Sequence, residues 1–211
     1  MVTSLVFASV LAGALASLLH AIRVEDRLQE VISKTASSAT FVGLGFVRWS
    51  AGDTVGGWLL AGLALCAVGD VLLLGRRTFD AGIFAFLLGH VLYIIGFHTA
   101  SPVAGWSLEV LAPLALAAVA ACRWLWPHLG RRKATVSAYV LVITVMVWGG
   151  LSGWWSQTLP WTAALGALLF YLSDLAVARQ RFVHPSFVNR AVGLPLYYAG
   201  QFLIALTIGM G

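Results

Sequence analysis

Two aspartates, Asp70 and Asp174, are the residues of this chain that are best suited to do chemistry. Each follows a small residue inside a hydrophobic run, in the strings LCAVGDVLLL (residues 65–74) and LLFYLSDLAVA (168–178). A carboxylate inside a bilayer costs about 2.5–3.5 kcal/mol on insertion scales, so such a residue is usually retained for pairing or for chemistry. Two carboxyls that share a buried site tend to take different protonation states. The pair is therefore the best clue in the sequence to function, and two carboxyls of this kind are suited to general acid and base catalysis.

The elements that position these aspartates are predicted to be membrane-spanning helices. The 211 residues are 60% hydrophobic and 10% charged, whereas a soluble domain has about 25% charged residues. A spanning helix needs about 20 mainly apolar residues, and the alternating pattern of a membrane β-barrel is absent. The sequence predicts an all-α, polytopic bundle of eight transmembrane helices in a single domain, 1–211, with segments near 2–22, 30–48, 57–75, 80–99, 107–126, 134–151, 158–178 and 188–209.

Basic residues are concentrated in alternate connections, namely those after the first, third, fifth and seventh predicted helices. By the positive-inside rule these connections face the cytoplasm, which places both termini outside and opens the site toward the cytoplasm. The same bias accounts for the net charge of +5, so no nucleic-acid partner is implied. We expect an integral protein of a bacterial inner (cell) membrane. The residues that carry the bias include Arg23, Arg27, Arg76, Arg77, Arg123, Arg131, Arg132, Lys133, Arg179, Arg181 and Arg190.

The two halves of the chain look alike around the aspartates. Each aspartate comes near the end of a predicted helix and is followed by an arginine, Arg76 in one half and Arg179 in the other. This predicts an internal repeat, 1–105 and 106–211, of two four-helix units in parallel orientation. It also places both aspartates about one turn from their helix ends, at the same depth.

Other polar residues fall in the same half of the predicted bundle. Lys34 and Tyr139 lie near helix starts, and His90, Tyr198 and Gln201 lie deeper, which predicts a shared cavity. Each has a structural alternative: Lys34 can snorkel to the interface or pair with an aspartate, and His90 can bond a carbonyl. The tyrosines and the glutamine can join helices by hydrogen bonds. The functional interpretation is favoured only for the aspartates.

Several motifs resemble the signatures of the YhhN family, which includes the lysoplasmalogenases. The first is GDVLL (69–73), followed by FDAG (79–82) and FLLGHVLY (86–93); the second is GALLFYLSDLAVA (166–178), followed by YAGQ (198–201). Tyr139 fits the pattern of the helix between them. The similarity runs over essentially the whole chain and agrees with the eight-helix count. One departure is Thr35, where the family commonly has proline after its lysine, so the direction of Lys34 is less defined.

The resemblance implies hydrolysis of the vinyl ether bond of lysoplasmalogens, giving a fatty aldehyde and a glycerophospho-ethanolamine or -choline. It also implies site residues. Asp70 and Asp174 would be catalytic, and the substrate-binding residues would be Lys34, His90, Tyr93, Tyr139, Tyr198 and Gln201.

Vinyl ethers hydrolyse by protonation of the β-carbon, and water then captures the oxocarbenium ion. Two carboxyls suit this reaction because a protonated one can supply the proton while an ionised one stabilises the cation. Neither a metal nor another cofactor is required, and the implied partners are a lysophospholipid or ether-lipid substrate and bilayer lipids. The sequence leaves four points open: which aspartate is the acid, the physiological substrate, the oligomeric state, and whether Lys34 and the loop arginines bind the phosphate. Two alternatives remain, a small-molecule or proton-coupled carrier and a non-catalytic lipid-binding protein.

Overall fold

The computed structural model describes residues 2–75 and 77–210, and over these residues the chain folds into eight α-helices. The all-α prediction is confirmed, and most helix ends lie within a few residues of the predicted ones. Arg76 lies outside the described residues. The helices are α1 (Val2–Arg23), α2 (Arg27–Arg48), α3 (Thr54–Leu72), α4 (Phe79–Ala100), α5 (Leu108–Leu125), α6 (Lys133–Trp155), α7 (Trp161–Ala178) and α8 (Phe187–Thr207).

Six of the described helices are long and apolar enough to cross a membrane, so the chain is an integral membrane protein. The other two, α2 and α8, have 22 and 21 residues, which is also a spanning length. They are less apolar because they carry buried polar side chains, among them Ser37 on α2 and Gln201 on α8. The six apolar spans are Val2–Arg23, Thr54–Leu72, Phe79–Ala100, Leu108–His128, Gly130–Trp155 and Trp161–Val183.

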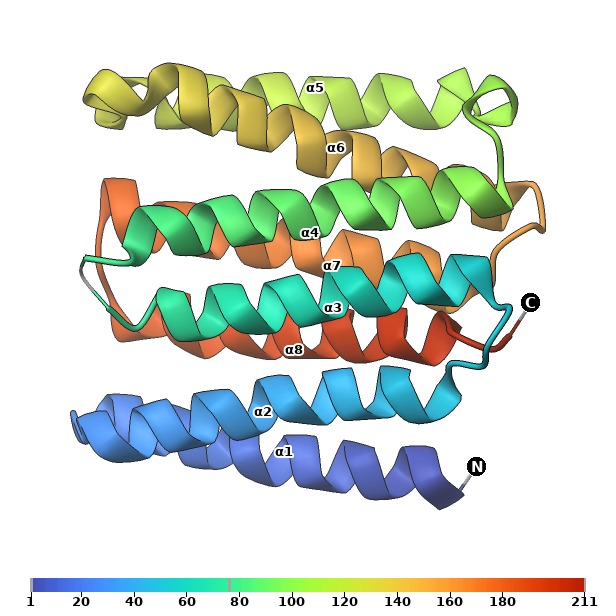
Figure 1. Cartoon of the computed structure of the whole chain (residues 1–211). Helices are drawn as coiled ribbons and strands as arrows, with labels where there is room; N and C mark the ends of the chain where they lie inside the picture. The colour runs from blue at the N-terminus through green and yellow to red at the C-terminus, as the bar shows by residue number, and fades with distance from the viewer. Residues whose placement is uncertain (1, 76, 211) are drawn as a thin grey trace.

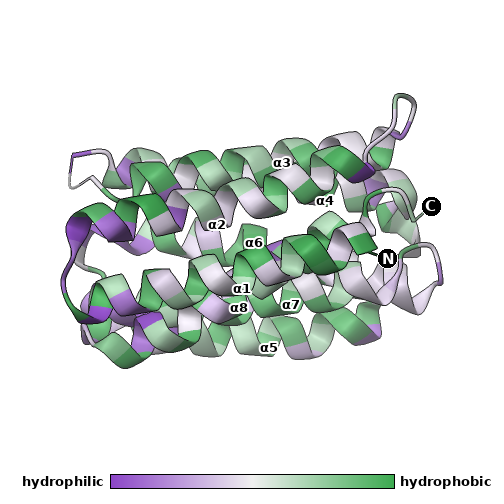
Figure 2. Ribbon diagram, turned by 90° about the horizontal axis from the view of Figure 1, so that it is seen from below, coloured by the Kyte–Doolittle hydropathy of each residue, from purple (hydrophilic) through white to green (hydrophobic). Residues whose placement is uncertain are grey.

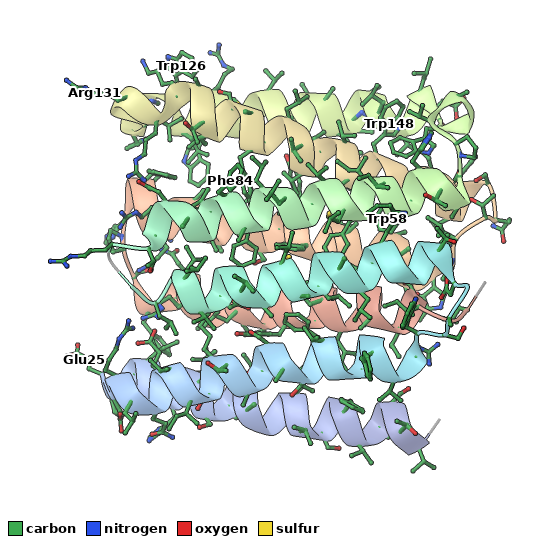
Figure 3. The ribbon with its side chains drawn as sticks, in the orientation of Figure 1. Glu25, Trp58, Phe84, Trp126, Arg131 and Trp148 are labelled. Atoms are coloured by element: carbon green, nitrogen blue, oxygen red, sulfur yellow. The ribbon has the colours of Figure 1, made fainter. Side chains whose placement is uncertain are left out.

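The helices form a bundle in which α3, α4, α7 and α8 occupy the middle, α1 and α2 one side and α5 and α6 the other (Figure 1). The α1–α2, α3–α4, α5–α6 and α7–α8 connections all lie at one end, which we call the arginine-rich end, and both termini lie at the other. Arg131 and Glu25 lie at the arginine-rich end, whereas Trp148 lies toward the opposite end (Figure 3). The membrane side that each end faces, and the repeat of 1–105 in 106–211, stay predictions.

Hydrophilic residues gather at the helix ends and connections, and long apolar stretches separate them (Figure 2). Several helices begin at a side-chain cap, which satisfies a backbone N–H of the first turn. The carboxylate of Asp26 accepts from the backbone N–H of Gln29 at the start of α2, and that of Asp53 accepts from Gly56 at the start of α3. Ser186 caps α8 in the same way.

Two central helix pairs pack closely because glycines face each other across them. A Cβ atom at Gly166 would lie 2.9 Å from the carbonyl oxygen of Gly200, and one at Gly200 would lie 2.9 Å from that of Gly166. On the α3–α4 pair, a Cβ at Gly62 would lie 3.1 Å from the carbonyl oxygen of Gly89. Small residues of this kind let membrane helices approach closely. The aspartate-bearing helices α3 and α7 are thereby fixed against their hairpin partners.

Candidate active site

A cavity of about 700 Å³ opens among the helices near the arginine-rich end. Side chains from α2, α3, α4, α6, α7 and α8 line it, and both aspartates are among them, Asp70 from α3 and Asp174 from α7. Lys34 of α2 and Tyr139 of α6 also contribute to its wall. The structure therefore brings four of the predicted site residues to one cavity.

Asp70 is surrounded by donors. The ammonium Nζ of Lys34 lies 3.2 Å from its Oδ1, and the hydroxyls of Ser38 and Tyr197 each donate to its Oδ2 over 2.7 Å. Lys34 and Ser38 are four residues apart on α2, so they share a helix face. An ionised carboxylate only accepts hydrogen bonds, and a cation with two hydroxyl donors suits that form. The side chain of Asp70 is 3% exposed, so this set of contacts is largely shielded from bulk solvent, although Asp70 lines the cavity.

Asp174 has a different environment. The hydroxyl of Tyr139 donates to its Oδ2 over 2.9 Å, and the Nε2 atom of His90 lies 3.8 Å from the same oxygen. Its side chain is 19% exposed, which makes it the more accessible of the two carboxyls to a molecule in the cavity.

The tautomer of His90 follows from its other ring nitrogen. Nδ1 lies 2.7 Å from the carbonyl oxygen of Phe86 and must donate there, because a carbonyl only accepts. In the neutral ring Nε2 then carries the lone pair, and this buried atom has no hydrogen-bond partner among the described residues. An acceptor that faces a carboxyl oxygen favours a carboxyl that carries a proton. The His90 and Asp174 pair is therefore equipped to hold a proton at the cavity wall.

Several predicted site residues lie behind the cavity wall. The Tyr93 hydroxyl donates to Oε1 of Gln201 over 2.7 Å, and the Tyr198 hydroxyl donates to the Lys34 carbonyl oxygen over 3.3 Å. These three side chains and His90 are fully buried and do not line the cavity. Their contacts join α2, α4 and α8, so the structure places them where they support the wall.

Tyr197 and Ser38 contact Asp70 directly, and they are absent from the residues that the sequence pointed to. Helical spacing carried a signal for both. Ser38 follows Lys34 by four residues, and Tyr197 follows Arg190 by seven, which is two turns on the same face. Arg190 lines the cavity, so the face of α8 that bears it leads to Tyr197 rather than to Tyr198.

Basic side chains, Arg181 and Arg190, line the part of the cavity at the arginine-rich end, which we call its mouth. Arg190 pairs with Glu30 at the start of α2, and Arg27 pairs with the other oxygen of Glu30 at 3.0 Å. Arg181 lies over the ring of Phe79 with its guanidinium carbon 4.0 Å from the ring centre. Guanidinium groups match the geometry of phosphate oxygens, so an anionic head group fits this mouth.

A short π-helix, η4 (Arg179–Val183), extends α7 and carries Arg181. Such turns are uncommon and are often found at functional sites. The side-chain carbonyl of Gln180 accepts from the backbone N–H of Ser186 and from the amide of Asn189, over 2.8 and 3.1 Å. These contacts tie η4 to the start of α8, which fixes one side of the mouth.

Comparisons with known proteins give a consistent result. The model of the YhhN family matches residues 29–208. The bovine protein named lysoplasmalogenase TMEM86A is 32% identical over 175 residues, which are 78% of this chain and 69% of that protein. Rat lysoplasmalogenase TMEM86B is 34% identical over 152 residues, or 71% of this chain and 61% of that protein.

A bacterial relative gives a similar figure. The lysoplasmalogenase of Mycobacterium tuberculosis (strain CDC 1551 / Oshkosh) is 33% identical over 168 residues, which are 73% of this chain and 61% of that protein. The chain thus spans roughly two thirds of the length of these relatives. No solved structure is significantly similar to the chain.

Proposed function

The chain belongs to the YhhN family, and from that membership we propose that it is a membrane-embedded hydrolase of lysoplasmalogens. It cleaves the vinyl ether bond and releases a fatty aldehyde and a glycerophospho-base. The observation that carries this proposal is the pair of carboxyls on one cavity with unlike partners, one among donors and one facing an acceptor. The names of the relatives support the choice of substrate.

In this mechanism Asp174 is the general acid. Its carboxyl proton passes to the β-carbon of the vinyl ether, where the electrons of the double bond form the new C–H bond. The adjacent carbon becomes an oxocarbenium ion, and Asp174 is left as a carboxylate. Tyr139 keeps the carboxyl in place for this transfer by its hydrogen bond to Oδ2, and the Nε2 atom of His90 lies 3.8 Å from the same oxygen. General acid catalysis of this kind is worth about 10²–10⁴-fold.

Asp70 supplies the negative charge. Its carboxylate faces the cavity with Lys34, Ser38 and Tyr197 fixed around it, so it stabilises the cation without reorganising. It also orients the attacking water. The water oxygen bonds to the cationic carbon, and the water proton passes to the Asp174 carboxylate, which restores the acid.

The resulting hemiacetal then collapses. Its hydroxyl proton is transferred to the glycerol oxygen as the bond between that oxygen and the former vinyl carbon breaks. The products are the fatty aldehyde and the free glycerol hydroxyl, so one water is consumed and the enzyme returns to its starting state. Carboxyl pairs serve oxocarbenium-like transition states in glycosidases by comparable chemistry.

The location of the site follows from charge. The mouth of the cavity bears Arg181 and Arg190, and basic residues dominate the connections at that end. By the positive-inside rule this end faces the cytoplasm and both termini face outside, in the inner membrane of a bacterium. The phosphate of the lipid then enters at the mouth from the cytoplasmic leaflet, where the arginines and Lys34 offer positive charge.

The direct test is mass spectrometry of purified protein incubated with lysoplasmalogen. We expect a fatty aldehyde and the glycerophospho-base, and we expect Asp174→Asn to slow the formation of both about 10²–10⁴-fold. A lysophospholipid with an ester in place of the vinyl ether is the matched control. Ester cleavage without aldehyde would assign another lipid hydrolase. Substrate counterflow in proteoliposomes without products would assign a carrier, and lipid binding without either would leave a non-catalytic protein.

A further inference from the structure

A second cavity, of about 360 Å³, adjoins the first between α4, α6 and α7. The two cavities share Ile83, Tyr139, Asp174 and Val177 in their walls. The carboxyl of Asp174 therefore stands at the border between them, whereas Asp70 lines only the larger one.

The two cavities differ in chemical character. The larger one has Lys34, Arg181 and Arg190 in its wall. In the smaller one the charged side chains other than Asp174 are Asp80 and Arg132, which pair with each other over 3.1 Å. Apolar side chains make up most of the remaining wall, namely Leu125, Val136, Val140, Ile143, Leu175 and Phe182.

We infer that the smaller cavity is the binding site for the hydrocarbon chain of the substrate. The inference rests on the proposed function and deepens it, because it assigns the two ends of the lipid to two compartments. A lysoplasmalogen has its vinyl ether where the polar glycerophosphate meets the chain. With the phosphate at the arginines and the chain in the apolar cavity, that bond lies at the border. The carbon to be protonated is the second carbon of the chain, so it lies beside Asp174 at this border.

The contribution of this cavity is to position the chain. A lipid tail leaves one apolar environment for another when it moves from the bilayer into the protein, so little hydrophobic free energy is gained. Fixing the chain instead holds the reacting carbon against the acid, and a misplacement of 1 Å can cost ~10²-fold in rate. A blocked cavity is therefore expected to lower turnover of long-chain substrates.

Val140→Trp tests the inference by filling the cavity from α6. Val140 lines the smaller cavity and does not line the larger one. We expect kcat/KM to fall about tenfold or more for a lysoplasmalogen with a hexadecenyl chain, since the chain loses its place. The loss should be several-fold smaller for a short butenyl analogue, because a short chain occupies less of the cavity.

Leu141→Trp is the matched control, since Leu141 is the next residue on α6, is 63% exposed and lines neither cavity. It should leave both substrates unaffected. An equal loss on the long and the short substrate by Val140→Trp, or no loss on either, would overturn the inference.

A second experiment does not depend on catalysis. A non-cleavable saturated ether lysophospholipid with a diazirine in the middle of its chain is photolysed with the protein, and the labelled peptides are mapped. We expect label on the α6 and α7 residues of the cavity, and its loss in Val140→Trp. If a diacyl phospholipid probe labels the same residues equally, the cavity is an ordinary lipid-facing groove and the inference fails. Specific labelling by this probe, together with no aldehyde release from lysoplasmalogen in the mass-spectrometry assay, would instead overturn the proposed function and leave the chain site standing.

Discussion

Asp70 and Asp174 occupy similar positions within their helices, each near the end of an apolar helix, yet the structure gives them opposite surroundings. Asp70 is 3% exposed and accepts from an ammonium and two hydroxyls. Asp174 is 19% exposed, accepts from one tyrosine and faces the unprotonated nitrogen of a histidine. The environment of a buried carboxyl is thus set by the partners that neighbouring helices bring to it. In the proposed mechanism one carboxyl keeps its charge and the other gives up a proton.

Asp174→Asn is expected to have the largest effect on activity, and it tests this division of roles between the two carboxyls. Asn has the same shape but no acidic proton, so we expect kcat to fall about 10²–10⁴-fold. The thermal unfolding temperature in detergent should change little, because no buried cation depends on Asp174. Activity that survives the change would assign the acid elsewhere.

Asp70→Asn should affect both rate and stability. We expect kcat to fall about 10²–10³-fold, because a fixed charge near the developing cation is lost. The free energy of unfolding should also fall by about 3–5 kcal/mol, because the change leaves Lys34 buried without its partner. Denaturant titration in detergent measures this loss.

The double variant Lys34→Met with Asp70→Asn separates the two effects. It removes the unpaired charge, so stability should recover while activity stays low. A single variant as stable as the unchanged protein would show that the ion pair does not hold the Asp70 region together.

The two tyrosines that donate hydrogen bonds to the aspartates are expected to have smaller and different effects. Tyr139→Phe removes the donor to Asp174, and we expect kcat to fall about tenfold with KM unchanged, the equivalent of about 1.4 kcal/mol. Tyr197→Phe removes one of several donors to Asp70, so its effect on kcat should be smaller and its effect on stability larger. Steady-state kinetics and thermal unfolding of both variants decide this. The reverse ranking would contradict the assignment of acid and stabiliser.

Arg190→Gln is expected to have the smallest effect. Arg190 is partly exposed at the mouth and already paired with Glu30, so we expect KM for the phosphate-bearing substrate to rise up to about fivefold with kcat unchanged. Arg131→Gln removes an exposed charge at the same end of the bundle from a residue that lines neither cavity, and it serves as the control. An equal rise in both variants would attribute the effect to the net charge of the surface.

Much of the fold could be predicted because hydrophobic length and charge bias decide which segments cross a membrane. The same signals placed Asp70 and Asp174 near one end of the bundle, together with Lys34 and Tyr139. The rotation of each helix about its axis was harder to predict, since it depends on neighbours that are distant in sequence. Tyr197 and Tyr198 differ by about 100° around α8, and the prediction named Tyr198, whereas the structure places Tyr197 on Asp70.

The proposed identity of the acid could not be predicted from the sequence for a related reason. It depends on which ring nitrogen of His90 faces Asp174, and that is fixed by the Phe86 carbonyl one turn earlier on the same helix. Likewise, the border position of Asp174 depends on packing between α4, α6 and α7. A sequence lists these groups, but the partition of space around them is a property of the assembled bundle.

Both ends of the described chain, Val2 and Met210, lie at the end of the bundle opposite the arginine-rich end (Figure 1). The cavity residues Lys34, Arg181 and Arg190 lie toward the arginine-rich end. A reporter fused to either end therefore lies in the same compartment. Alkaline phosphatase should give the same activity reading at both ends, and a fluorescent protein should give the same fluorescence reading at both ends. The same geometry suits immobilisation. A tag at either end would hold the protein on a sensor surface with the mouth of the cavity facing the solution, where lipid nanodiscs can deliver substrate.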